Sequence, residues 1–114
     1  MHDLEKKMIE LGAIDNAIDS IKIDEWFENV TITYTGKDDM SSVVCSFENC
    51  YEISLKHDRT YSKEKDDDGN LDYKYFIQDI SIVEDGEFYI FKVSAWPLDG
   101  LIICKSINIR TINK

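Results

Sequence analysis

The sequence predicts an α+β fold that is mostly β, in which an N-terminal helix packs on an antiparallel sheet or partly open barrel of about six strands. Two observations predict it. Apolar residues recur every three or four positions up to residue 21, and from residue 30 they alternate with polar residues. The chain has 114 residues, 43% of them hydrophobic, which suits one core. We therefore expect a single domain over residues 1–114.

A helical segment is expected over residues 1–24. Asp3 is a candidate cap, and a stripe at helical spacing follows it, formed by Leu4, Met8, Leu11, Ile14, Ile18 and Ile21. Gly12 interrupts the stripe at a cost of about 1 kcal/mol, so two shorter helices are an alternative. Trp26 and Phe27 come next, and we expect them to anchor the helix on the sheet.

Antiparallel β-structure is expected over residues 30–112. Alternation and turn signals predict strands near 30–35, 43–47, 51–55, 73–83, 88–95 and 101–112. Residues 48–50 read as a tight turn, and Asp85-Gly86 as a two-residue hairpin turn. The 73–83 run is apolar on both faces in places, which predicts a central strand. The last strand, bulged near Lys105-Ser106, is an edge that a second copy could cover.

The strongest compositional signal is negative charge. The chain carries 23 acidic and 13 basic residues, a formal net charge of −10. Nucleic acid and anionic membrane surfaces are disfavoured as partners, because neutralising phosphates takes basic residues. A basic protein is the complementary partner, since opposite fields steer association. The alternative is an acidic surface that serves solubility alone.

We expect the chain to be cytoplasmic. No apolar run approaches the roughly 20 residues of a membrane span, and residues 1–10 lack the apolar region of a signal peptide. Three cysteines, an odd number, do not suggest a disulfide framework. Cys45 and Cys104 lie in apolar runs, so they are expected to be small buried hydrophobic residues.

The charged segment that follows His57 is the candidate binding site. Asp66, Asp67, Asp68 and Asp72 lie there with Tyr61 and Tyr73, and we expect these six residues to contact a protein partner. An alternative is a small-ligand or calcium-binding β-domain that uses the acidic loop at 64–72. The spacing matches a calcium loop only in part, because its last position is Tyr75 instead of a bidentate Glu.

We expect no enzymatic activity, no cofactor and no dedicated metal site. Metal-ligand spacings such as Cys-x-x-Cys are missing from the sequence. Alternation along a strand would place Cys50 and His57 on opposite faces, which disfavours a Cys–His pair. Asp79, in an otherwise apolar run, is the one carboxylate that an acid–base alternative would use.

The rhythm of the later strands resembles small immunity proteins of bacterial polymorphic-toxin systems. It is carried by Trp26-Phe27, VVCSFENCYEISL (43–55), YFIQDISI (75–82) and GLIICKSINI (100–109). The resemblance covers about two-thirds of the chain and implies a protein that binds and neutralises a toxin without catalysis. Toxins with nuclease activity are often basic, so an acidic inhibitor could cover the surface meant for nucleic acid. No contact residue is transferred by the resemblance.

Overall fold

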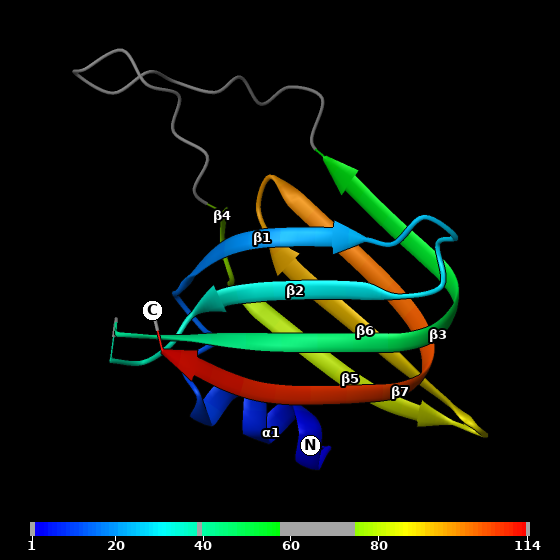
Figure 1. Ribbon diagram of the computed structural model, residues 1–114, viewed down its shortest axis with the longest axis horizontal. Coiled ribbons are helices and arrows are strands. Elements are labelled where there is room, and N and C mark those ends of the chain that lie inside the picture. The colour runs from blue at the N-terminus through cyan, green and yellow to red at the C-terminus, as the bar shows by residue number, and fades with distance from the viewer. Residues whose placement is uncertain (1, 39, 58–74, 114) are drawn as a thin grey trace.

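A computed structural model describes residues 2–38, 40–57 and 75–113. Within these residues, one helix accompanies a seven-stranded antiparallel sheet in the order β4-β1-β2-β3-β7-β6-β5. The sheet curls into a half barrel (Figure 1), which confirms the predicted fold class. The elements are α1 (Asp3–Glu10), β1 (Ala17–Ile23), β2 (Val30–Thr35), β3 (Ser41–His57), β4 (Tyr75–Phe76), β5 (Asp79–Asp85), β6 (Phe88–Ala95) and β7 (Leu98–Asn113).

The helix is much shorter than the predicted segment 1–24. It begins after His2, whose ring nitrogen accepts a hydrogen bond from the Leu4 backbone N–H, and it ends at Glu10. The chain then turns through Gly12 at φ +97°, a conformation that strongly favours glycine. A Cβ on Gly12 would lie 3.0 Å from the Lys37 backbone. Residues 17–23, predicted to be helical, instead form strand β1, so that part of the prediction is wrong.

Two long paired strands form the centre of the sheet. β3 spans 17 residues and β7 spans 16, and they pair along almost their whole length. The turn predicted at 48–50 is wrong, because Asn49 takes a left-handed conformation (φ +55°) and the strand continues. The extra residue in the pairing is Tyr51, opposite Cys104 and Ile103, and not the predicted bulge near Lys105.

The β5–β6 hairpin lies where the sequence placed it. Its two turn residues are Gly86 and Glu87, one position later than predicted, and Gly86 has φ +63°. The single central strand predicted over 73–83 is wrong, because its described strand residues belong to β4 and β5, which lie at opposite edges of the sheet. β7 lies inside the sheet rather than at its edge. Helix α1 covers the β5 edge, where the Ile82 N–H donates to the Glu5 carboxylate over 2.8 Å.

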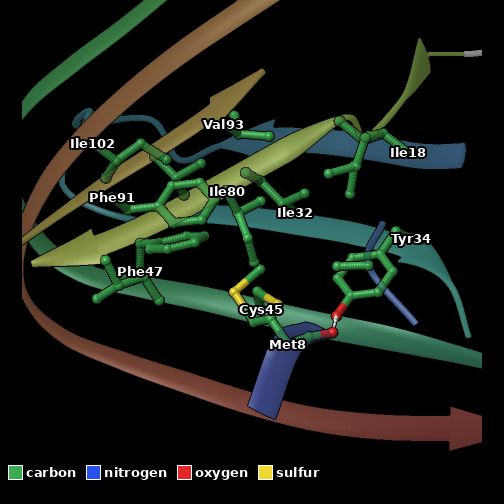
Figure 2. Packing of buried hydrophobic residues seen from close by; sticks show 14 of the residues in the cluster. Met8, Ile18, Ile32, Tyr34, Cys45, Phe47, Ile80, Phe91, Val93 and Ile102 are labelled. Atoms are coloured by element: carbon green, nitrogen blue, oxygen red, sulfur yellow. Dashed lines mark hydrogen bonds between the residues drawn. The ribbon is translucent and has the colours of Figure 1, made fainter. Parts of the chain in front are cut away.

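The core lies inside the curl, between α1 and strands from both halves of the sheet (Figure 2). Phe47 of β3 packs against Phe91 of β6 with ring centroids 4.6 Å apart. The Tyr34 hydroxyl donates to the Met8 carbonyl over 3.0 Å, tying β2 to the helix. The largest side chains that are almost completely buried are Tyr34, Phe47, Phe91, Met8, Ile32, Ile77 and Ile102.

Candidate functional site

The loop between β1 and β2, residues 24–29, exposes two aromatic side chains. Trp26 is 77% exposed and Phe27 is 68% exposed. The prediction that this pair anchors the helix on the sheet is therefore wrong. Both lie beyond the end of β1, whereas α1 contacts β5 and β7. Large apolar side chains are usually the first to be buried, so their exposure in one loop calls for a functional reason.

Asp24 fixes the conformation of this loop. One of its carboxylate oxygens accepts the backbone N–H groups of Glu28 (2.8 Å) and Asn29 (3.2 Å), and the other accepts the Asn29 side-chain amide (2.7 Å). The Asp24 N–H also donates to the Asn29 carbonyl over 3.0 Å, which closes the loop at its base. The six residues 24–29 are therefore closed into a loop by the side chain and the backbone N–H of Asp24.

The same hydrogen bonds set the acidity of Asp24. Desolvation by itself would raise the pKa of this carboxyl, but the bonds from Glu28 and Asn29 outweigh it, so the pKa lies below its usual range. Asp24 is therefore ionised, and its carboxylate accepts hydrogen bonds from within the loop.

Phe27 has φ +58°, in the left-handed region that bulky residues rarely adopt. Its N–H donates to the Asp24 carbonyl over 3.3 Å. Strain of this kind persists only where the surrounding contacts fix the chain, and it tends to occur at functional positions. The loop thus holds an exposed ring in a conformation that the isolated residue would avoid.

The loop is also attached to the bend in β3. The Glu28 carbonyl accepts the Cys50 N–H over 2.7 Å, and the Asn29 side-chain oxygen accepts the Asn49 N–H over 3.3 Å. Next to this contact, Tyr51 is 62% exposed and meets Phe88 edge-on with centroids 4.7 Å apart. Tyr51 thus adds a third exposed aromatic residue, next in the chain to Cys50, whose N–H bonds the loop.

The chain on either side of these aromatic residues is acidic. Residues 24–29 and 48–52 together contain five carboxylates and no lysine or arginine. Glu25, Glu28, Glu48 and Glu52 are exposed, whereas Asp24 is engaged inside the loop. Lys105 lies near this region, with its ammonium 5.9 Å from the Phe88 ring centroid.

A shallow hollow of about 410 Å³ lies over β3, β5, β6 and β7. Two lysines and two carboxylates line it, Lys56, Lys92, Asp79 and Asp99, together with serine side chains. Asp79, the carboxylate singled out for acid–base chemistry, is exposed there. Among the described residues, every buried side-chain nitrogen and oxygen has a hydrogen-bond partner within the protein.

The six residues predicted to contact a partner, Asp66, Asp67, Asp68, Asp72, Tyr61 and Tyr73, lie outside the described residues. The calcium alternative at 64–72 falls in the same part of the chain. Over residues 2–38, 40–57 and 75–113, no group of three or more His, Cys, Asp or Glu side chains is placed to hold a metal ion.

All three cysteines are buried free thiols. Burial raises the pKa of the Cys45 and Cys104 thiols to about 12, which leaves them neutral. Cys50 lies directly opposite Cys104 on the neighbouring strand, and burial raises its pKa as well. The prediction that Cys45 and Cys104 are small buried hydrophobic residues is confirmed.

Comparison with known proteins places the chain in a family. A family model described as "Immunity protein PIM7" matches residues 1–111. The chain belongs to the PIM7 immunity protein family. The match covers nearly the whole sequence, including the N-terminal helix, and it confirms the resemblance to small immunity proteins that the strand rhythm indicated.

The fold of this PIM7 family member is shared with a solved structure. A crystal structure of an uncharacterized protein from Neisseria gonorrhoeae superposes with a TM-score of 0.61, covering 85% of this chain and 91% of that one at 12% identity. At that identity the likeness concerns the fold alone. No curated protein matches the sequence. In the described part of the chain, no helix is long and apolar enough to cross a membrane.

Proposed function

We propose that this chain is a cytoplasmic, non-catalytic immunity protein that neutralises a toxin by binding it. The observation that carries the proposal is the PIM7 immunity family match over residues 1–111. An immunity protein must recognise the toxin that its own cell produces or meets, and tight binding is sufficient to block an active site. Neutral buried thiols and an exposed Asp79 offer no obvious catalytic centre among the described residues.

The toxin is basic in this proposal. A net charge of −10 raises the rate at which a positively charged protein associates and lowers the rate for nucleic acid. A toxin that acts on nucleic acid presents such a basic surface to its substrate, and an acidic inhibitor competes for it. The acidic segment with Asp66, Asp67, Asp68 and Asp72 supplies part of the negative field, and Tyr61 and Tyr73 supply apolar contacts beside it.

The test is growth rescue in a bacterial host. A basic toxin domain that the purified chain captures from a lysate of its source organism is expressed from an inducible promoter, alone and together with the immunity chain. Restored growth, with a complex that weakens as salt rises, is the expected result. Continued growth arrest with no complex between the purified proteins would contradict the proposal.

The acidic segment is tested by its effect on the association rate. Replacing Asp66, Asp67 and Asp68 together by Asn should slow association at least about 10-fold at low salt, because rates of steered encounter depend on local charge. The matched control replaces three exposed aspartates of other regions, Asp15, Asp79 and Asp85, and changes the net charge equally. Equal slowing by both triple variants would show that only net charge matters.

A further inference from the structure

We propose that Trp26 and Phe27 are the side chains that anchor this chain on a basic face of its toxin. The inference rests on the proposed function and adds to it the surface that makes the contact. We call this the Trp26 surface: Trp26 and Phe27 of the β1–β2 loop, Tyr51 of β3, and the neighbouring carboxylates of Glu25 and Glu28.

The three rings have the properties of interface anchors. They are between 62% and 77% exposed, and two of them are adjacent in one loop. Tryptophan and tyrosine are the residue types most enriched at positions that dominate binding, because they bury a large area with few rotatable bonds. None of the three belongs to the buried core cluster, in which the helix packs on the sheet.

The loop is fixed before any partner arrives. Asp24 holds Glu28 and Asn29 through three hydrogen bonds, and the Glu28 carbonyl joins the loop to Cys50 of β3. A partner therefore does not have to order the backbone on binding, which removes part of the entropic cost of association. Phe27 takes a left-handed backbone conformation in this loop, which costs free energy and tends to occur at functional positions.

The charge around the rings identifies the kind of partner. Five carboxylates and no lysine or arginine lie in residues 24–29 and 48–52, and four of the carboxylates are exposed. A basic face with an apolar depression complements this pattern. A second copy of the chain does not, because a symmetric contact would bring the same carboxylates together. The occupant is accordingly the toxin domain and not another immunity chain.

The experiment measures the dissociation constant of the complex by calorimetry. The partner is the same captured toxin domain, inactivated by a substitution in its active site. Trp26→Ala is expected to weaken binding at least about 30-fold, the range of an interface anchor. The matched control is Met40→Ala, beyond the opposite end of β2, because Met40 is an apolar side chain of similar exposure, 73%. The control should stay within about two-fold of wild type.

A second variant distinguishes a lost contact from a misfolded chain. Phe27→Gly removes the ring and relieves the left-handed backbone, so it should fold at least as well as Phe27→Ala while binding about 10-fold or more weakly than wild type. In an otherwise wild-type chain, replacing Glu25 and Glu28 by lysine should weaken binding at low salt, because it reverses the charges that attract the partner. The same change should reduce the salt dependence of binding.

The outcomes separate this surface from the proposed function. Wild-type binding with loss in Trp26→Ala and none in Met40→Ala supports both. Wild-type binding that Trp26→Ala leaves within about three-fold overturns the Trp26 surface and leaves the immunity function standing. Failure of the wild type to bind overturns both. A dimer of the free chain that Trp26→Ala abolishes would assign the surface to self-association and also overturn the proposal.

Discussion

The most revealing single substitution is at Phe27, because the structure reverses the usual ranking of glycine and alanine there. Phe27 lies in a loop at φ +58°. Elsewhere in a folded chain, alanine is the more stabilising of the two, since glycine has more freedom to lose on folding. At a left-handed position the Cβ of alanine is strained and glycine is not. We expect Phe27→Gly to be more stable than Phe27→Ala.

The size of the difference follows from two opposing terms. A Cβ in the left-handed region costs roughly 1–2 kcal/mol. The greater freedom of glycine in the unfolded chain costs roughly 0.4–1 kcal/mol in the other direction. Both variants lose the same ring, so the small burial of the Phe27 side chain cancels between them. The net advantage of glycine is about 0.5–1 kcal/mol, or about 2–4 °C in Tm for a domain of this size.

Urea unfolding of both variants, followed by circular dichroism, measures this difference directly. The control pair is Met40→Gly and Met40→Ala, because Met40 is exposed in a turn without positive φ. At Met40, alanine should be the more stable by roughly 0.4–1 kcal/mol. If alanine were also the more stable at Phe27, the loop would not hold the left-handed conformation, and the argument for a preorganised Trp26 surface would fail.

Three further predictions concern stability. Tyr34→Phe should lower the free energy of unfolding in urea by about 1 kcal/mol, the low end for a lost buried hydrogen bond. The loss is small because the Met8 carbonyl still accepts the Ala13 N–H. A loss above about 3 kcal/mol would contradict this reasoning. The free energy of unfolding should fall as pH rises from about 9 towards 12, because the thiols of Cys45 and Cys104 ionise at lower pH in the unfolded chain than in the folded one. Each thiol contributes a slope of about 1.4 kcal/mol per pH unit. Cys45→Ala should make the slope shallower, and an unchanged slope would contradict the raised pKa of Cys45. Glu5→Ala removes the acceptor of the Ile82 N–H, so amide hydrogen exchange at the β5 edge should accelerate while exchange in β2 does not. Equal acceleration in both strands would show general destabilisation instead.

Much of the sheet could be predicted because its strands obey local rules. Val30, Ile32 and Tyr34 alternate with threonines, and in the structure the apolar residues are buried and the threonines are half-buried. The β5–β6 hairpin follows from a glycine next to an acidic residue between two apolar runs. Where the side-chain period and the turn chemistry agree, the sequence alone is sufficient to place a strand within one or two residues.

The errors arose where long-range contacts decide between local alternatives. Ile14, Ile18 and Ile21 have helical spacing, but Gly12 and Asp15 take positive φ and end the helical region, after which Ile18 and Ile21 pair with β2. The pairing with β7 similarly carries β3 through Asn49, which tolerates a left-handed backbone better than most residues. Near Asn49 this pairing joins residues more than 50 positions apart, such as Cys50 and Cys104, and it leaves no local pattern.

The exposed loop was missed for a different reason. Hydrophobicity predicts burial on average, and Trp26 and Phe27 are therefore assigned to the core by any rule that counts apolar residues. A local signal was nevertheless available: the pair stands among Asp24, Glu25 and Glu28, and no apolar residue lies two positions before or after either ring. Aromatic residues enclosed by carboxylates are a better indication of a contact surface than of a core.

The claim that this PIM7 family member acts by binding is tested most directly by titrating the active toxin domain with the purified chain. The toxin activity that remains is measured against the molar ratio of the two proteins. Binding without catalysis requires a linear fall that reaches zero at one immunity chain per toxin, with Trp26→Ala needing a large excess. Complete inactivation by a small fraction of one equivalent would reveal a catalytic protein, and undiminished activity at any ratio would contradict the immunity function itself.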